Sequence, residues 1–426
     1  MRRMVMRDPG GSGRPAPTST NHGDEMTHAG NRDTTVVVIG AGPAGLTLAC
    51  LLQRSNVDCV VLEARSRAYV ERRQRAGMLD HTAGEIFLEH GLADRVLSDA
   101  RRETHLELRY EGVPRLVDVP GLADGRARWL VPQQVLLQRL IEVFLDGGGD
   151  LRFDVSDVVP HDLAGALPTV TYQDGTGARR QLRCGYVAGC DGYHGVSRAA
   201  IPPTAITTYS FDHGIRWITF LAEVPAPRHS LLGVSRHGFA AQFARGPATC
   251  RFYLQHRPGD DPLQWPDERV WEQLRLRFGD PLLPAGPITA RGAVDMRSFV
   301  TDPMSYGKLF LVGDAAHIIT PVGAKGMNLA IADAHVFARA VTAAEHDSDP
   351  AHLRAYSDDC LRRTWDYQEF SRWLAETFHF AADHTIDPFR RQLAKARLDR
   401  LFTSRTAATA FADLMAGTPT DLAKAG

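Results

Sequence analysis

Thr34 to Gly45 reads TTVVVIGAGPAG, and this stretch decides the fold. Its first six residues are β-branched, which is typical of a buried parallel strand. Gly40, Gly42 and Gly45 then follow at the spacing of a dinucleotide-binding turn. The first glycine permits the tight turn, the second lets the backbone approach a pyrophosphate, and the third lets the next helix pack closely against the strand.

The residues after the turn extend this pattern. Pro43 and Ala44 precede the helical segment LTLACLLQR, whose N-terminal amides are left for phosphate groups. A second strand, VDCVVLE, ends at Glu63, about where an acid meets the ribose hydroxyls of a non-phosphorylated adenosine. A glycine-rich turn without a ligand is the alternative interpretation, but the two strands, the helix and the acid together favour dinucleotide binding.

Composition narrows the class of protein. The chain has 426 residues, 44% of them hydrophobic, and a net charge of -1, which favours neither nucleic acid nor an anionic membrane surface as a partner. Six cysteines are spread along the chain without a C-x-x-C pair, so we expect reduced thiols, a cytoplasmic protein and no metal site. We also expect no membrane span, because no apolar run approaches the length that a membrane helix needs.

The chain is predicted to divide into parts of different character. Residues 1–31 are rich in Gly, Pro, Ser and Thr and are expected to be a disordered tail. We predict an α/β fold: a Rossmann-like dinucleotide-binding domain at 32–204 and 291–345, an inserted antiparallel-sheet substrate domain at 205–290, and a helical C-terminal region at 346–426. The inserted sheet is inferred from period-two alternation with Pro and Gly punctuation.

Two further motifs carry a resemblance to a known family. Val187 to Arg198 reads VAGCDGYHGVSR, and Lys308 to Asn328 reads KLFLVGDAAHIITPVGAKGMN. Together with the first glycine turn, they resemble the para-hydroxybenzoate hydroxylase family of FAD-dependent aromatic-ring monooxygenases. The resemblance covers the chain from about Thr34 to the C-terminal region. It implies an enzyme in which NADPH reduces FAD, and oxygen is transferred to an aromatic ring through a flavin hydroperoxide.

The resemblance implies the following cofactor positions. Asp314 corresponds to an acid that binds a ribityl hydroxyl, and Arg75 and Gln133 correspond to cofactor contacts; for Gln133 a simple capping role at a helix start is the alternative. The whole expected FAD set comprises Gly40, Gly42, Pro43, Ala44, Gly45, Glu63, Arg73, Arg75, Gln133, Asp191, Asp314, Gly323, Lys325, Gly326, Met327 and Asn328.

The loop at the start of the helical segment MNLAIADAHVFARAVTAA is expected to serve the reduced flavin. Residues 323–328 open that helix, and its N-terminal amides and positive dipole end suit an anionic isoalloxazine. Lys325 is expected to add positive potential there; a solvated loop lysine is the alternative. The expected catalytic group also includes Pro321, Asn328 and Arg251, the last matching a residue tied to flavin movement. His317 is assigned no acid or base role, because it lies within the motif that shapes this loop.

The electron donor is expected to be NADPH, bound without a Rossmann domain of its own. Tyr69, Arg73, His194 and Arg297 match family positions linked to the nicotinamide cofactor, although each is also explained as a surface residue. A preference for NADPH over NADH is predicted because guanidinium groups can hold a 2′-phosphate. The arginines concerned follow the second strand at Arg65, Arg67, Arg72 and Arg73.

The substrate is predicted from agreements with the family and departures from it. Arg245 and Tyr253 match its carboxylate-holding pair, which implies an aryl carboxylate. Other positions depart from the family. Phe243 stands where the family has a serine, and Leu232 or Gly233 where it has a phenol-binding tyrosine. In the family's proton relay, Met415 replaces a second tyrosine and Glu103 replaces a histidine, although a small shift of the alignment would place His105 at the histidine position.

Without that relay we expect a ring that is already electron-rich, such as a 4-amino or differently hydroxylated benzoate. An alternative is that 4-hydroxybenzoate is the substrate and that another group or water moves its proton. Two alternative functions are a flavin oxidase or dehydrogenase and a non-catalytic FAD-fold binding protein. The C-terminal aromatic residues are compatible with a homodimer contact or with a core.

Overall fold

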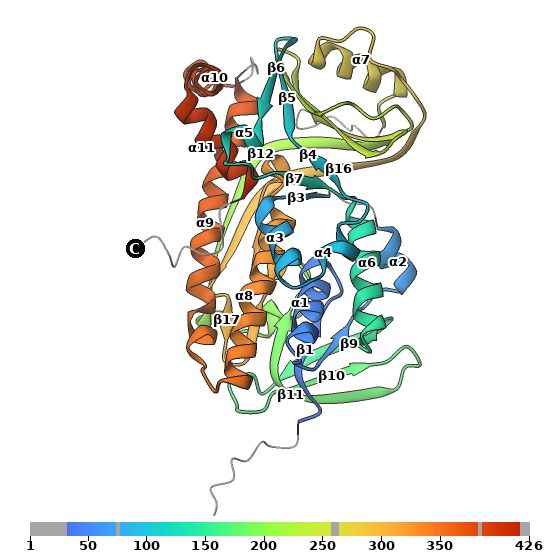
Figure 1. Cartoon of the computed structure of the whole chain (residues 1–426), viewed down its shortest axis with the longest axis vertical. Coiled ribbons are helices and arrows are strands. Elements are labelled where there is room, and N and C mark those ends of the chain that lie inside the picture. The colour runs from blue at the N-terminus through green and yellow to red at the C-terminus, as the bar shows by residue number, and fades with distance from the viewer. Residues whose placement is uncertain (1–31, 74–76, 257–263, 382–385, 418–426) are drawn as a thin grey trace, which may run out of the picture. The chain divides into compact units, whose positions relative to one another are not determined.

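The computed structural model describes residues 32–73, 77–256, 264–381 and 386–417. The expected disordered tail at residues 1–31 and the expected flavin contact Arg75 lie outside these ranges. The described chain contains three sheets, with helices packed around them (Figure 1). All six cysteines are buried and free, as expected for reduced thiols.

The first sheet confirms the predicted parallel core. β1 pairs in parallel with β2 on one side and with β11 on the other. Its strands, in spatial order, are β17 (Ser305–Tyr306), β18 (Leu309–Leu311), β11 (Arg179–Gly189), β1 (Thr34–Ile39), β2 (Cys59–Leu62) and β8 (Asp150–Arg152), with β10 (Thr169–Gln173) and β9 (Ser156–His161) extending from β11. Because β1 and β2 are buried along their whole length, they show the continuous apolar runs expected of a sheet covered on both faces.

The helices around this sheet follow from its apolar faces. α1 packs against both α6 and α8, and α8 packs against α9 (Figure 1). The helices are α1 (Pro43–Arg54), α2 (Arg67–Arg72), α3 (His81–Glu89), α4 (Ala93–Val96), α5 (Val119–Leu122), α6 (Gln133–Asp146), α7 (Asp267–Phe278), α8 (Gly326–His346), α9 (Ala351–Phe380), α10 (Pro388–Thr403) and α11 (Arg405–Ala416). Among the described residues, no helix is both long and apolar enough to cross a membrane.

The second sheet contains the predicted antiparallel strands of residues 205–290, and it is larger than predicted; its role in substrate binding stays a prediction. Its order is β19 (His317–Ile318), β16 (Ile288–Asp302), β12 (Thr207–Ala222), β15 (Thr249–His256), β14 (Gly238–Gly246), β13 (Ser230–Ser235), β5 (His105–Tyr110) and β6 (Val113–Asp118). Most neighbours are antiparallel, but β13 pairs with β5 in parallel. The sheet therefore takes strands from outside residues 205–290, because the open edge of β13 is completed by β5 from far earlier in the chain.

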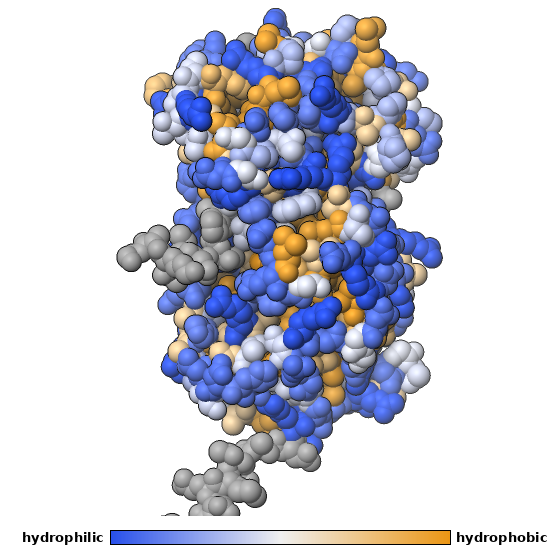
Figure 2. All heavy atoms as spheres, viewed as in Figure 1, coloured by the Kyte–Doolittle hydropathy of each residue, from blue (hydrophilic) through white to orange (hydrophobic). Residues whose placement is uncertain are grey.

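A small third sheet packs against the second one. It consists of β3 (Met78–Leu79), β7 (Arg128–Leu130) and β4 (Arg101–Glu103), with β7 in the centre. Met78 and Leu130 belong to a buried cluster with Ala244 of β14, so this sheet contacts the second sheet directly. Figure 2 shows that hydrophobic surface gathers at the level of α3 and α4, where these layers meet, while the surrounding surface is mainly hydrophilic. The division of the chain into domains stays a prediction.

Candidate active site

The glycine turn after β1 is shaped for a close ligand. Gly40 has φ +106°, a backbone conformation that favours glycine, and a Cβ there would lie 2.5 Å from the Cys190 carbonyl oxygen. A Cβ at Gly45 would lie 1.9 Å from the Gly40 carbonyl oxygen, so only glycine lets α1 pack here. A Cβ at Gly42, in contrast, would meet no described atom within 4 Å. Gly42 therefore borders open space at the N-terminus of α1, as a pyrophosphate site requires.

Glu63 and Asp314 are the two acids predicted to bind hydroxyl groups of the cofactor. Glu63 Oε2 accepts a hydrogen bond of 2.7 Å from the Ala41 amide, and its Oε1 accepts one of 2.8 Å from the Arg65 amide. These bonds hold the carboxylate against the glycine turn and leave lone pairs for further donors. Asp314 is exposed in the turn that follows β18. The residues present therefore fit the pyrophosphate and hydroxyl groups of FAD.

Asp191 is held by its own loop. Its Oδ2 accepts hydrogen bonds of 2.9 Å from both the amide and the hydroxyl of Ser197. Burial raises the pKa of this carboxyl group, although the Ser197 bonds act in the opposite direction. Its observed role is to shape the loop after β11, and its predicted cofactor contact stays a prediction.

The loop before α8 is held by a buried ion pair that the sequence did not predict. Lys325 Nζ lies 2.9 Å from Asp80 Oδ2 and 3.2 Å from the Met415 carbonyl oxygen, and the Lys325 side chain is only 1% exposed. The alternative of a solvated lysine is therefore wrong. Because Asp80 neutralises it, Lys325 does not act as an isolated positive charge, and its effect on a flavin stays a prediction.

The same loop is also tied to β3. The Asn328 side chain donates a hydrogen bond of 3.0 Å from its Nδ2 to the Met78 carbonyl oxygen. Its Oδ1 accepts one of 3.0 Å from the backbone N–H of Asp80. Pro321 begins a short 3-10 turn (Pro321–Gly323), after which Ala324 adopts φ +54°. These contacts fix the direction of α8, and among the described residues no side-chain cap is found at its N-terminus. The amides of Gly326 and Met327 thus begin a helix of 21 residues with its positive dipole end exposed to the loop.

Gln133 begins α6, as predicted, and is buried. A Cβ at Gly77 would lie 1.8 Å from the Val131 carbonyl oxygen and 2.8 Å from the Gln133 nitrogen, so the strand that leads to β3 runs directly past this helix start. The capping alternative for Gln133 is not supported, because no side-chain cap is found at this helix start among the described residues.

The residues predicted to bind the nicotinamide cofactor fall into two groups. In the first, the guanidinium groups of Arg65 and Arg73 lie 5.4 Å and 5.8 Å from the centre of the exposed Tyr69 ring. Tyr69, Arg72 and Arg73 also border a shallow hollow of about 400 Å³. Arg67 is instead paired with Glu71 at 2.6 Å, so its guanidinium group is already engaged and less able to bind a 2′-phosphate.

In the second group, His194 and Arg297 meet on one aromatic ring. The Arg297 guanidinium lies 4.1 Å from the centre of the Tyr193 ring, and the His194 ring packs edge-on against Tyr193 at 4.9 Å. The structure thus brings these two predicted residues together, although they are far apart in sequence.

The predicted substrate residues converge on one apolar cluster. Leu232, Tyr253 and Met415 belong to the same buried cluster, against which Phe243 packs. The Phe243 and Tyr253 rings meet edge-to-face at 5.9 Å. Leu232 rather than Gly233 faces this cluster, because a Cβ at Gly233 would lie 2.7 Å from Phe278 on the opposite side of the sheet. Strand alternation explains the difference between the two neighbours.

Two arginines bring buried donors to the edge of this cluster. Arg245 Nη1 and Arg251 Nε are buried and have no hydrogen-bond partner among the described residues. Burial lowers the pKa of Arg245, and the neighbouring Tyr253 acts against this effect. Arg251 Nη2 donates to the Thr219 hydroxyl at 3.1 Å, so this side chain is partly committed. An unpaired guanidinium nitrogen in an apolar surrounding is the donor that an anionic ligand would satisfy.

Glu103 and His105, the two candidates for the relay histidine position, have different surroundings. Glu103 is 3% exposed, and its two oxygens accept hydrogen bonds from the amide and hydroxyl of Ser230 at 2.9 and 2.7 Å. The His105 ring lies 5.2 Å from the His229 ring and bonds the Thr104 hydroxyl. Glu103 is therefore buried and hydrogen-bonded, whereas His105 is only partly buried, and the assignment of either residue to the relay position stays a prediction.

Three residues of this region were not identified from the sequence. Arg128 is buried opposite Glu103 in the β4–β7 pair, and its Nε and Nη2 have no hydrogen-bond partner among the described residues. Burial lowers the pKa of Arg128, whereas Glu103 and Asp80 act against this shift. Tyr367 is buried in the same cluster as Met415, with its ring 4.8 Å from Lys325 Nζ. Of the three, only Asp80 could have been identified from the sequence, because an acid directly before a helix start is typical of an N-cap.

His317 has the structural role that the sequence favoured. Its Nε2 lies 2.7 Å from Asp333 Oδ2, and the same oxygen accepts a hydrogen bond of 3.1 Å from the Gly313 amide. Burial alone would lower the pKa of His317, but the Asp333 carboxylate outweighs it, so the pKa lies above its usual value. The pair joins α8 to the turn that carries Asp314.

Comparison with known proteins adds to this geometry. The FAD binding domain family matches residues 33–371. The chain is 34% identical over 394 residues to the p-hydroxybenzoate hydroxylase of Acinetobacter baylyi, covering 91% of this chain and 96% of that protein. It is 28% identical over 372 residues to a 3-amino-4-hydroxybenzoate 2-monooxygenase of Streptomyces platensis, covering 83% and 91% of the two chains.

A solved structure supports the fold. The p-nitrophenol 4-monooxygenase of Pseudomonas putida matches with a TM-score of 0.76 at 19% identity, over 90% of this chain and 98% of that one. At this identity the match establishes the shared architecture: a parallel sheet with a glycine turn, joined to an antiparallel layer and long C-terminal helices.

Proposed function

The chain belongs to the FAD binding domain family and is a flavoprotein aromatic hydroxylase, and from this premise we propose that its substrate is a small aryl carboxylate with an electron-rich ring. 4-Aminobenzoate and differently hydroxylated benzoates are the compounds of this class that we favour. The proposed electron donor is NADPH, and the proposed oxygen source is molecular oxygen.

The observation that carries the proposal is the buried, unpaired Nη1 of Arg245 beside Tyr253. A guanidinium nitrogen left without a partner in an apolar surrounding costs free energy until an acceptor binds. A carboxylate is the planar anion that a guanidinium matches best, and the Tyr253 hydroxyl is a second donor for it. The aromatic ring of such an acid would then lie against Leu232, Phe243 and Met415.

The nature of these apolar side chains supports an electron-rich substrate. Leu232 and Met415 have no hydroxyl group that could accept or pass on a proton, so they give no help in deprotonating a substrate phenol. They fill the space with apolar atoms and exclude water from the ring. An amino group activates a ring without losing a proton, and a pocket of this kind therefore suits it.

FAD, when bound, supplies the redox chemistry that passes electrons from the nicotinamide donor to oxygen and inserts one oxygen atom into the ring. The protein residues orient and enclose the reactants. Glu63 and Asp314 are proposed to bind hydroxyl groups of the cofactor, and the open space at Gly42 is proposed to receive its pyrophosphate. The amides at the start of α8 are proposed to stabilise negative charge on the flavin ring.

4-Hydroxybenzoate is the second candidate, and two observations favour it. The relative from Acinetobacter baylyi is a p-hydroxybenzoate hydroxylase. In addition, Tyr367 is a buried phenol in the same cluster as Met415, close to Lys325. A proton path through Tyr367 would replace the missing tyrosines. Under this alternative, Tyr367→Phe abolishes productive turnover of 4-hydroxybenzoate, whereas our first candidate predicts little effect on 4-aminobenzoate.

Ligand binding to the FAD-loaded enzyme tests the substrate class. Titration of the flavin absorbance with 4-aminobenzoate, 4-hydroxybenzoate and the neutral analogue 4-aminobenzamide compares acids with a matched amide. We expect saturable spectral changes with the acids and much weaker binding of the amide. Equal binding of acid and amide would reject the aryl carboxylate.

The donor preference is tested with two single variants of the α2 surface. Arg73→Ala is expected to raise KM for NADPH more than KM for NADH, because a 2′-phosphate loses a guanidinium partner. Arg67→Ala is the matched control, since Glu71 already pairs with Arg67. Equal catalytic efficiency of the wild type with NADPH and NADH would reject the preference.

A further inference from the structure

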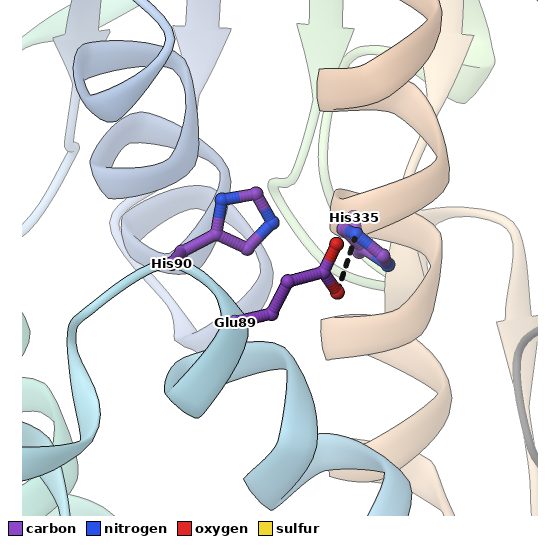
Figure 3. A group of neighbouring side chains, drawn as sticks. All are labelled: Glu89, His90 and His335. Carbon is purple, nitrogen blue, oxygen red and sulfur yellow. Dashed lines mark ion pairs between the residues drawn. The ribbon is translucent and has the colours of Figure 1, made fainter.

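Glu89, His90 and His335 form a cluster outside the candidate active site (Figure 3). Each side chain offers one ligand atom, and these atoms all lie within 4.8 Å of one another. Glu89 is the last residue of α3, His90 follows it directly, and His335 comes from the middle of α8. Figure 3 shows the Glu89 carboxylate between the two imidazole rings.

The details of this cluster suit a ligand more than a packing contact. His90 Nε2 is buried and has no hydrogen-bond partner among the described residues. The Glu89 Oε2 to His335 Nε2 distance is 3.8 Å, and the His90 and His335 rings lie 5.3 Å apart at 77°. A buried imidazole nitrogen without a partner is costly, and a metal ion would satisfy it.

We propose that Glu89, His90 and His335 bind one Zn²⁺ ion, which joins the end of α3 to α8. Two imidazoles and one carboxylate are a ligand set that zinc accepts, with water in the fourth position. Tetrahedral zinc ligands lie about 3.4 Å from one another. The exposed Glu89 side chain can turn to close the remaining gap. Mg²⁺ and Ca²⁺ are poor candidates, because they prefer oxygen ligands.

The surrounding charges act in both directions. Burial lowers the pKa of His90, as does the nearby Arg339, while Glu89 raises it. Arg339 opposes a bound cation, but it is exposed and can turn away. The carbonyl groups at the C-terminal end of α3 favour positive charge.

The position of the site suggests what the ion would do. α3 and α8 pack side by side, and their starts are joined by Asp80 and Lys325 (Figure 1). The cluster lies about 14 Å further along both helices, at 1.5 Å per residue. A metal ion there would fix the end of α3 to the middle of α8, in addition to the Asp80–Lys325 contact at the starts of the two helices. Its role is structural, because the site is remote from the loop.

Calorimetric titration tests the proposal. FAD-loaded enzyme is treated with chelator, dialysed and titrated with ZnCl2 and, separately, MgCl2. We expect one Zn²⁺ per chain, no Mg²⁺ binding, and a rise in Tm of about 2 °C or more with saturating zinc. The variants His90→Gln and Glu89→Gln are expected to lose this binding and the Tm rise. Both change residues that are at least partly exposed, so the fold is retained.

His161→Gln is the matched control, because it removes an exposed histidine of β9. It is expected to bind zinc as the wild type does. X-ray absorption at the zinc edge is expected to show only nitrogen and oxygen ligands, including imidazole. Unchanged stoichiometry and affinity in His90→Gln, or an absence of zinc binding by the wild type, would overturn the proposal.

Discussion

Lys325 Nζ lies 2.9 Å from Asp80 Oδ2, and both side chains are buried. The two residues are 245 positions apart in sequence, and each directly precedes a helix, Asp80 before α3 and Lys325 before α8. The pair therefore links the third sheet to the loop before α8. Asp80 also caps α3 through its Oδ1, which accepts from the Ala83 amide at 3.0 Å.

This pair predicts a strong coupling in stability. Asp80→Asn retains a cap for α3 but leaves Lys325 as a buried charge, and Lys325→Met leaves Asp80 unpaired. Each change is expected to lower the free energy of unfolding by about 3 kcal/mol, because an unpaired buried charge is costly. The double variant is expected to lose less free energy of unfolding than the sum of the losses in the two single variants. Urea unfolding of all four proteins measures the coupling, and additive losses would show that the residues do not depend on each other.

The glycine turn predicts a separation between folding and cofactor binding. Gly42→Val places a side chain in space that no described atom occupies, so the protein should fold but lose FAD. Gly45→Ala should instead destabilise the protein itself, since its Cβ would lie 1.9 Å from the Gly40 carbonyl oxygen. Flavin absorbance and the thermal unfolding of the apoprotein distinguish the two effects. Normal flavin content in Gly42→Val would contradict the assigned pyrophosphate site.

Arg245 predicts the affinity for the aryl carboxylate. Arg245→Ala should raise KM for the acid by roughly 10- to 150-fold, the equivalent of about 1.5–3 kcal/mol for a charged hydrogen bond. FAD content should not change. Arg216→Ala is the matched control, because Arg216 lies on β12 of the same sheet but is partly exposed and paired with Asp295. A KM that stays at the wild-type value in Arg245→Ala would remove the residue from the substrate site.

The His317–Asp333 pair predicts a pH dependence of stability. The pKa of His317 is raised in the folded protein: burial lowers it, but Asp333 outweighs burial. The charged histidine therefore stabilises the fold fully below its unfolded pKa of about 6.5, and this contribution is lost as the pH rises through the raised folded value. Thermal unfolding of wild type and His317→Gln at several pH values should show a difference in Tm that narrows above neutral pH. A constant difference would argue against a charged His317.

Much of the fold follows from local patterns in the sequence. The β-branched run at Thr34–Ile39 and the glycines after it determine β1, the turn and α1 without any long-range information. The period-two segments likewise predict β12 to β15. The pairing of β5 with β13 was missed, because nothing local in residues 105–110 indicates which distant strand completes an open edge.

The site was predicted less completely than the fold. Residue types that a motif demands were found, such as Gly42 and Glu63. The partners of those residues were not, because a buried ion pair such as Lys325–Asp80 depends on how remote segments pack. Arg128 shows the same limit: an arginine between apolar residues carries no signal that it will be buried opposite Glu103.

The ratio of hydroxylated product to NADPH consumed, measured with 4-aminobenzoate and 4-hydroxybenzoate side by side, distinguishes the two candidate substrates. We propose that the enzyme holds its substrate against Leu232, Phe243 and Met415 and hydroxylates aryl carboxylates whose ring needs no deprotonation. The account predicts a ratio near one with an electron-rich acid such as 4-aminobenzoate, and a far lower ratio with 4-hydroxybenzoate. Rapid turnover of 4-hydroxybenzoate to 3,4-dihydroxybenzoate with a ratio near one would contradict it.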